Sequence, residues 1–165
     1  LFDLIMPLFD KTILFVPFMI LPWLYAVFFD KNNRWKLALL IPLVIILVDQ
    51  SGLLIKKTVL RPRPWAAFEL DLVNHLVGPK GKNFSFPSNH AANISGLAII
   101  FSEIYHSYKY FFWMIAGVVI FSRVYIGVHY PSDVISGCVI GILYGLLLIK
   151  CWGHFNNKSS EYQKI

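Results

Sequence analysis

Long apolar runs separated by short polar segments dominate the sequence. Residues 12–29 contain no charged side chain, residues 37–55 contain only Asp49, and residues 134–149 contain none. About 20 predominantly apolar residues span the hydrocarbon core of a bilayer. The three runs therefore predict three transmembrane helices.

Two weaker apolar stretches lie between the second and third of these runs. Residues 88–107 carry Glu103, and residues 110–128 carry Arg123 near their end. The first ten residues, LFDLIMPLFD, fit either an interfacial amphipathic helix or the remnant of another segment. The pattern predicts an all-α fold, a polytopic membrane bundle of five to six transmembrane helices with a long extramembrane loop. We expect residues 1–165 to form a single membrane domain with a polar, frayed tail at 151–165.

Composition supports a membrane protein. Apolar residues make up 57% of the chain and charged residues 15%, against about 45–50% and about 25% in ordinary soluble domains. Fifteen Lys and Arg residues against nine Asp and Glu give a formal charge of +6. These cations cluster at the ends of apolar runs, where they anchor helices or meet anionic headgroups. We therefore expect no nucleic-acid partner, and no obligatory protein partner is inferred.

The connections between the predicted helices are unequal. The segment 56–87 is long and contains the sequence RPRP, whereas 123–133 is short. Five helices place both connections at the same membrane face, and loops longer than about 12–15 residues are commonly functional. The last apolar run also carries Gly137, Gly141 and Gly145 at a spacing of four residues. Such a stripe predicts close packing against a second membrane helix.

Polar residues gather in three clusters at this face. Ionisable groups near membrane helices are costly, so each cluster needs an explanation. Taken singly, each cluster has a structural explanation, since a lysine at a helix end is usually an anchor and a serine or aspartate there is usually a cap. All three at one face favour a functional site. The clusters are Lys56 with Arg63 and Pro64; Pro87 to His90; and Ser122, Arg123, His129 and Asp133.

Together the clusters predict a site for an anion. Ser88 is a favoured N-cap, which leaves the next three backbone N–H groups at a helix N-terminus, a natural phosphate site. Lys56, Arg63 and Arg123 contribute cations, and arginine offers paired donors to phosphate oxygens. Asp133 can orient the imidazole of His129, which leaves His90 as the candidate general acid.

The three clusters resemble the signatures of the type 2 phosphatidic acid phosphatase superfamily. Those signatures are Lys, six residues, Arg-Pro; Pro-Ser-Gly-His; and Ser-Arg, five residues, His, three residues, Asp. Here they read KKTVLRPRP from Lys56, PSNH from Pro87 and SRVYIGVHYPSD from Ser122. A register starting from Arg61-Pro62 would need a lysine at position 54, which is leucine. Asn89 takes the place of the usual glycine.

The resemblance implies a metal-independent phosphatase without a cofactor. His129 would attack phosphorus to form a phosphohistidine, Asp133 would orient His129, and His90 would protonate the leaving oxygen. The remaining signature residues would hold the other phosphate oxygens. These are Lys56, Arg63, Ser88, Asn89 and Arg123. The side-chain amide of Asn89 is a further candidate donor to a phosphate oxygen or a headgroup.

A site at a membrane face suits a phosphorylated lipid. The compact chain, the basic loop with Lys80 and Lys82, and Asn89 favour the 1-phosphate of lipid A. Undecaprenyl diphosphate, phosphatidylglycerol phosphate and phosphatidic acid remain alternatives, as does phosphate transfer to another lipid. A lipid or anion transporter is the alternative of a different class, but transport pathways need polar residues near the middle of the bilayer, where only Asp49 lies.

The charge distribution gives a weak indication of orientation. Seven of the fifteen Lys and Arg residues fall on the face opposite the clusters; the other face holds eight, of which Lys56, Arg63 and Arg123 are assigned to the site. The positive-inside rule then favours a site outside the cytoplasm, at the periplasmic side of a bacterial inner membrane. Asp49 lies two helical turns before Lys56, and we favour a structural pairing near Gln50 and Ser51 over an effect on Lys56.

Overall fold

The computed structural model describes residues 1–68, 73–77 and 84–162, apart from the side chains of residues 12, 15, 18 and 157–162. In these ranges the protein is helical, with one isolated bridge between Pro62 and Phe84. The long helices are α2 (Thr12–Phe29), α3 (Arg34–Val59), α5 (Asn89–Ile104), α6 (Lys109–Tyr125) and α7 (Pro131–Tyr162). The short helices are α1 (Phe2–Ile5), η1 (Met6–Asp10), α4 (Pro64–Ala67) and η3 (His106–Tyr108).

The five predicted apolar runs coincide with the five long helices of the described chain. Helix α2 has the predicted bounds, whereas α3 and α7 extend beyond them. Helix α7 continues to Tyr162, through residues expected to be a frayed tail, because no proline interrupts it and Gly153 alone does not end a helix. By length and composition, Arg34–Val59 and Pro131–Asn156 can cross a membrane. The number of crossing helices stays a prediction.

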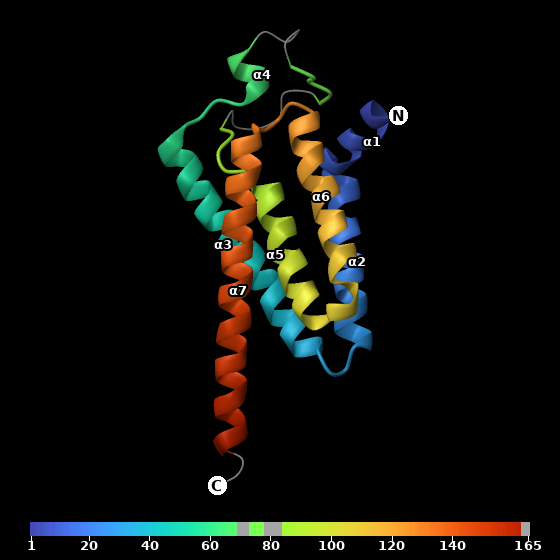
Figure 1. The fold of residues 1–165 in the computed structure, drawn as a ribbon, viewed down its shortest axis with the longest axis vertical. Coiled ribbons are helices and arrows are strands. Elements are labelled where there is room, and N and C mark those ends of the chain that lie inside the picture. Colours follow the sequence, from blue (N-terminus) through green and yellow to red (C-terminus); the bar gives the residue numbers. More distant parts are fainter. Residues whose placement is uncertain (69–72, 78–83, 163–165) are drawn as a thin grey trace.

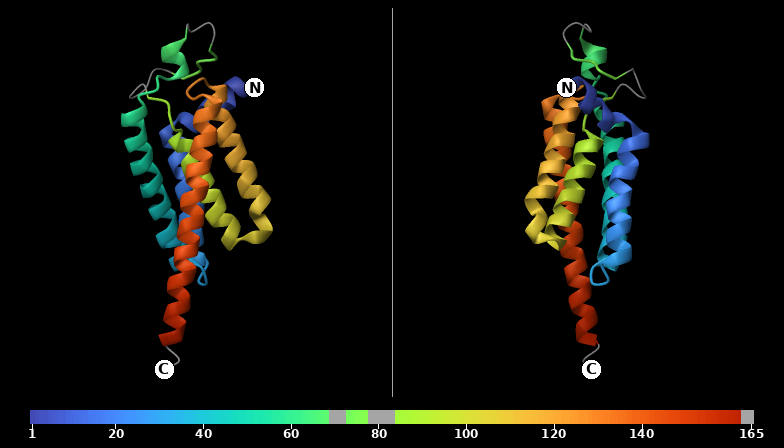
Figure 2. Two further views of the ribbon diagram at one scale, coloured as in Figure 1. Left: turned by 60° about the vertical axis from the view of Figure 1, so that its left-hand side comes forward. Right: turned by 90° about the vertical axis from the view of Figure 1, so that its right-hand side faces the viewer.

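Helix α5 lies at the centre of the bundle (Figure 1). It packs most extensively against α7, then against α6 and α3, while α2 packs against α3. The views in Figure 2 show α2 and α3 side by side on the opposite side of the molecule from α6. The C-terminal ends of α3 and α6 meet the N-terminal ends of α5 and α7 at the end of the bundle that carries α4 and the N-terminus. The chain therefore brings the predicted clusters to one end.

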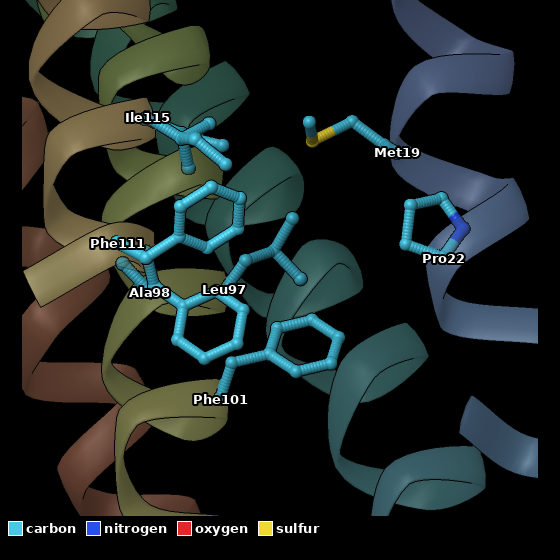
Figure 3. Close-up of a pocket in the computed structure, with 9 residues that line it drawn as sticks. Met19, Pro22, Leu97, Ala98, Phe101, Phe111 and Ile115 are labelled. Atoms are coloured by element: carbon cyan, nitrogen blue, oxygen red, sulfur yellow. The ribbon is translucent and has the colours of Figure 1, made fainter. Parts of the chain in front are cut away.

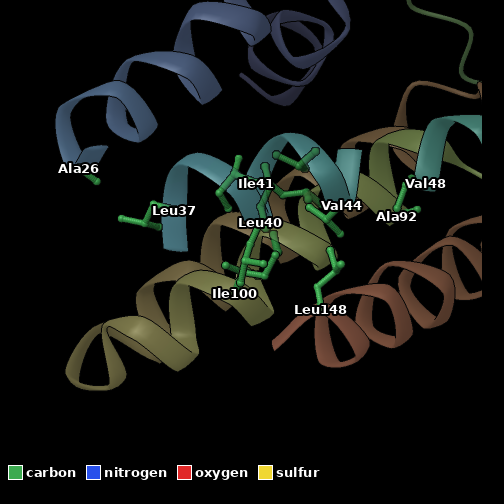
Figure 4. Close-up of a cluster of buried hydrophobic side chains, with 14 residues drawn as sticks. Ala26, Leu37, Leu40, Ile41, Val44, Val48, Ala92, Ile100 and Leu148 are labelled. Carbon is green, nitrogen blue, oxygen red and sulfur yellow. The ribbon is translucent and has the colours of Figure 1, made fainter. Parts of the chain in front are cut away.

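Aliphatic side chains from the five long helices fill the core (Figure 4). Leu37, Val44 and Val48 of α3 and Ile100 of α5 are almost fully buried, and Leu148 of α7 packs against the same cluster. Many large apolar side chains point outward instead, among them Leu39, Ile46, Leu143 and Leu147. Outward-facing apolar surface on this scale is typical of contact with lipid rather than water.

The glycine stripe of α7 lies against α5, which confirms the predicted close packing. A Cβ at Gly137 or Gly141 would clash with the carbonyl oxygens of Ser88 and Ala92, and a Cβ at Gly145 would clash with the side chain of Ile99. Backbone carbonyls cannot move aside without shifting a helix. The glycines therefore set the distance between α5 and α7.

We expect Gly141→Ala to destabilise the bundle by about 1–3 kcal/mol, the usual cost of overpacking. Gly153→Ala is the matched control on the same helix, because a Cβ at Gly153 would meet no atom within 4 Å. Thermal unfolding midpoints in detergent micelles measure the difference. Equal midpoints for the two variants would show that the α5–α7 contact is not tight.

Candidate active site

The last turn of α3 places Lys56 beside the start of α5. Its Nζ donates to the carbonyl oxygen of Pro87 and to Oδ1 of Asn89, the latter at 2.9 Å. Helix α3 ends at Leu60, which has a left-handed conformation with φ of 52°. This C-cap turns the chain toward the segment that carries Arg63.

Ser88 joins the starts of α5 and α7. Its Oγ accepts a hydrogen bond from the backbone N–H of Ala91 at 3.4 Å, as an N-cap does. The backbone N–H of Ser88 donates to the carbonyl oxygen of Asp133 at 3.0 Å. Both residues are fully buried. The predicted cap is confirmed, and it fixes His90 on the first turn of α5 beside the start of α7.

Arg123 is buried at the end of α6, with 1% of its surface exposed. Its Nη1 pairs with Oδ1 of Asp10 at 3.0 Å, and its Nε donates to Oγ of Ser122. The carbonyl oxygen of Arg123 accepts from the backbone N–H groups of Val128 and His129. These bonds turn the α6–α7 connection back on itself, so that His129 lies beside Arg123.

His129 and Asp133 face each other across the first turn of α7. Nδ1 of His129 lies 3.6 Å from Oδ2 of Asp133, and Ser85 donates its hydroxyl to the same carboxylate oxygen. The backbone N–H of Tyr130 donates to it as well, at 2.9 Å. Asp133 is fully buried and His129 is 4% exposed. Because Nδ1 is directed at the carboxylate, Nε2 is the nitrogen that remains for reaction.

Two residues that the signatures do not include complete this arrangement. Nη1 of Arg61 donates to Oδ1 of Asp133 at 2.8 Å and to Oγ of Ser132, and its guanidinium lies 3.9 Å above the ring centre of Tyr130. Ser85 is the other. The signature spacing assigns a role to Arg63 and none to Arg61. The RPRP pattern does indicate a role for Arg61, because residues two apart in an extended segment face the same side and Arg61 therefore faces the same side as Arg63.

Arg63 caps the short helix α4 and reaches the α6–α7 connection. Its Nη1 donates to the carbonyl oxygen of Val128 at 3.3 Å. Burial lowers the pKa of Arg63, and the nearby carboxylates of Asp10 and Asp133 oppose that shift. Lys56 and Arg123 also lie near enough to act electrostatically on His90, as does Arg63. The structure thus brings the three predicted cations to the two histidines.

Two of the cations have N–H donors without a hydrogen-bond partner among the described residues. Within the described part of the chain, Nε of Arg63 and Nη2 of Arg123 are buried and make no hydrogen bond. Buried guanidinium donors without partners are costly. An anion with several oxygens bound between these residues would satisfy them. Among all the residues that the structure describes, no three or more His, Cys, Asp or Glu side chains are placed to hold a metal ion.

Asp49 accepts hydrogen bonds from Asn89 and Asn93 of α5, both at 3.0 Å. These bonds agree with the expected structural pairing of Asp49 with polar groups of the bundle. One expectation is corrected: the Asn89 side chain lies between Asp49 and Lys56, so its amide is not directed at a phosphate oxygen. The packing of α5 beside α3 causes this difference. Lys80 and Lys82 lie outside the described residues.

The first ten residues lie across the α6–α7 connection as α1 and η1. Met6 is buried against Ile126 and Val128. The carboxylate of Asp3 accepts a hydrogen bond from the Tyr125 hydroxyl at 2.8 Å. Together with the ion pair of Asp10, these contacts dock the segment onto the site. No local sequence pattern marks Asp10 as a partner of a signature arginine.

An apolar cavity of about 200 Å³ lies between α2 and the pair α5–α6 (Figure 3). Met19 and Pro22 of α2 face Leu97 and Phe101 of α5 across it. Ile94 also lines the cavity and follows His90 by four residues, which is one helical turn. The cavity therefore begins about one turn below the histidine, toward the middle of the bundle.

Burial controls the charge of His129. Desolvation lowers its pKa to about 4, with Arg63 and Lys56 adding to the shift and Asp133 opposing it. The imidazole is therefore neutral at pH 7, the form in which a histidine is a nucleophile. In the unfolded chain the same group has a pKa of about 6.5.

This shift predicts a loss of stability in acid. Between pH 6.5 and pH 4 the unfolded chain binds a proton at His129 that the folded protein does not. The free energy of unfolding therefore falls as the pH falls through this window, by up to about 3 kcal/mol from this group. Thermal unfolding at several pH values should show a smaller decline for His129→Gln than for the wild type. His106→Gln, at an exposed position, is the matched control, and parallel curves for wild type and His129→Gln would contradict a neutral buried imidazole.

Comparison with known proteins yields relatives over most of the chain. The lipid A 4′-phosphatase of Bacteroides thetaiotaomicron is 35% identical over 156 residues, which cover 88% of this chain and 67% of that protein. The lipid A 4′-phosphatase of Porphyromonas gingivalis is 30% identical over 140 residues, 81% of this chain and 59% of that protein. The chain thus spans about three fifths to two thirds of the length of these relatives.

A solved structure shows the same fold. The crystal structure of Aquifex aeolicus LpxE superimposes with a TM-score of 0.66 at 28% identity, covering 80% of this chain and 76% of that one. The sequence profile of the PAP2 superfamily matches residues 34–157 and includes every signature residue. The chain belongs to the PAP2 superfamily, the family that its three signatures resemble.

Proposed function

We propose that this protein is a membrane lipid phosphatase that works through a phosphohistidine. The observation that carries the proposal is the neutral, buried His129, held by Asp133 at 3.6 Å beside guanidinium donors of Arg63 and Arg123 that lack partners among the described residues. A nucleophile, an orienting carboxylate and unsatisfied cationic donors are the parts that phosphoryl transfer needs.

The proposed reaction has two steps. Nε2 of His129 attacks phosphorus in line, the N–P bond forms, and the bond from phosphorus to the lipid oxygen breaks as His90, protonated on both ring nitrogens once the phosphate anion lies beside it, gives that oxygen a proton. Water then attacks the phosphohistidine, the N–P bond breaks, and His90 takes a proton from the water. Asp133 holds Nδ1 of His129 throughout and stabilises the positive charge that the ring gains.

The binding groups surround the phosphate from several elements. Lys56 comes from α3, Arg63 from the loop, and Arg123 from α6. The backbone N–H groups of Asn89 and His90 lie at the N-terminus of α5, behind the Ser88 cap, where the helix dipole favours an anion. These donors stabilise the charge that the transition state spreads over the phosphate oxygens. The mechanism uses no metal and no cofactor.

A lipid substrate fits the surroundings of the site. The apolar cavity that begins one turn below His90 is lined by Met19, Leu97 and Phe101 among others, and it suits an acyl chain whose phosphate lies at headgroup depth. We further propose that the five long helices cross the membrane, and that the site faces the periplasm of a bacterial inner membrane.

Lipid A is the proposed substrate. Both relatives described above carry the name lipid A 4′-phosphatase, which favours the 4′-phosphate. The 1-phosphate, favoured on the sequence alone, is the second position to test. Undecaprenyl diphosphate, phosphatidylglycerol phosphate and phosphatidic acid are the comparison substrates.

Phosphate release from purified protein in detergent tests the proposal. We expect release from lipid A above that from the other three lipids, unchanged by EDTA, and mass spectrometry of the product identifies the position that loses phosphate. His129→Ala should lower the rate at least about 10³-fold, because it removes the nucleophile. His106→Ala, in η3 beyond the C-terminal end of α5, is the matched control and should keep the wild-type rate.

Three results would contradict parts of this proposal. A His129→Ala variant as fast as the wild type would exclude the phosphohistidine. Loss of activity with EDTA would show a metal requirement. No release from any lipid, together with lipid or anion movement across proteoliposomes, would favour a transporter, and appearance of the phosphate on a second lipid would favour transfer over hydrolysis.

A further inference from the structure

Asn89 occupies the position at which the resembled signature has glycine, and its side chain fits because another residue is a glycine. A Cβ at Gly52 of α3 would lie 2.5 Å from Oδ1 and 3.1 Å from Cγ of Asn89. Such contacts are too close for a side chain at position 52 while Asn89 keeps this conformation. Gly52 therefore provides the space on α3 that the Asn89 side chain occupies.

The Asn89 amide links two charged groups of α3. Its Nδ2 donates to Oδ1 of Asp49 at 3.0 Å, and its Oδ1 accepts from Nζ of Lys56 at 2.9 Å. A carboxylate only accepts and an ammonium only donates, so an amide fits between them in a single orientation. Asn93 donates a second hydrogen bond to the same oxygen of Asp49.

The two charges need such a bridge. Asp49 lies within an apolar run, where an uncompensated carboxylate is costly. Lys56 follows seven residues later, a rise of roughly 10 Å along the helix, which is too far for a direct ion pair. No described cation lies within ion-pair distance of Asp49. Asn89 reaches across from α5 and joins them.

The bridge also limits how Lys56 can point. An ammonium group has three N–H donors. Two of them are used by the carbonyl oxygen of Pro87 and by Oδ1 of Asn89. One donor is left, and Lys56 lies close enough to His129 and His90 to act electrostatically on both.

We propose that Asn89 is a positioning residue for Lys56. Its side chain, anchored by Asp49, holds the ammonium so that the remaining N–H meets a phosphate oxygen. The proposal rests on the proposed function, since it assigns Lys56 to the phosphate. It also means that the Asn89 side chain acts through Lys56 and does not read the lipid headgroup.

Asn89→Gly tests this role, since it restores the signature residue and removes the bridge. We expect kcat/KM for the best lipid substrate to fall about tenfold to hundredfold, the value of one charge-assisted hydrogen bond. The loss should fall on kcat rather than KM if the bond orients Lys56 for the transition state. Asn93→Ala is the matched control, because Asn93 bonds the same oxygen of Asp49 without contacting Lys56, and its activity should change less than about threefold.

A double-mutant cycle separates positioning from direct contact. In a Lys56→Met background, Asn89→Gly should cause no further loss, because its effect passes through the lysine. An additional loss in that background would assign the Asn89 side chain to the substrate. Equal losses in Asn89→Gly and Asn93→Ala would reduce the network to a structural role, and full activity of Asn89→Gly would also overturn the proposal.

Orthovanadate binding tests the same idea without turnover. Vanadate adopts the five-coordinate geometry of phosphoryl transfer, and calorimetric titration measures its affinity directly. Asn89→Gly should weaken vanadate binding about tenfold or more, and Asn93→Ala should not. If the wild type binds vanadate with this pattern but releases no phosphate from lipids, the proposed function fails while the positioning role stands; unchanged vanadate affinity in Asn89→Gly overturns the positioning role whatever the activity.

Discussion

The carboxylate of Asp133 is the group on which the site depends. It is fully buried, and a buried carboxylate is costly unless charge and hydrogen bonds compensate it. Arg61 compensates it from the long loop, Ser85 from the end of the same loop, and Tyr130 and His129 from the α6–α7 connection. Satisfying one carboxylate therefore fixes the positions of three chain segments, and the orientation of His129 follows from that requirement.

The backbone reinforces this arrangement through helix ends. Close packing at Gly137 brings α7 against Ser88, and the hydrogen bond from Ser88 to Asp133 sets the starts of α5 and α7 at the same level. Both N-termini, with their positive dipole ends, then lie at the site. Helices α3 and α6 end there, and each has a basic residue in its last turn, Lys56 and Arg123.

Local patterns in the sequence predict the parts that depend on neighbours along the chain. The apolar runs locate the five long helices, the glycine stripe predicts that the last helix packs closely against another helix, and the Ser88 cap is correct because capping is decided within four residues. Side-chain partners that come from distant segments of the chain have no local sequence pattern to predict them. Asp10 lies 113 residues before Arg123, and Arg61 lies 72 residues before Asp133. The bridge from Asp49 to Asn89 needs the spacing between α3 and α5, which no local pattern encodes.

The distribution of charge explains how the cations of the site are stabilised within an apolar bundle. Lys56 is linked through Asn89 to Asp49, Arg123 pairs with Asp10, and Arg61 pairs with Asp133. Each partner uses one edge or one donor of its cation and leaves another, so the pairing stabilises the cation without neutralising the site. Among the described residues Arg63 alone of these four cations has no carboxylate or bridging amide partner, only the carbonyl oxygen of Val128. A halide or a carboxylate would meet one or two of the remaining donors, whereas a phosphate presents three non-bridging oxygens to donors on three separate elements, so the pairing itself favours a tetrahedral oxyanion.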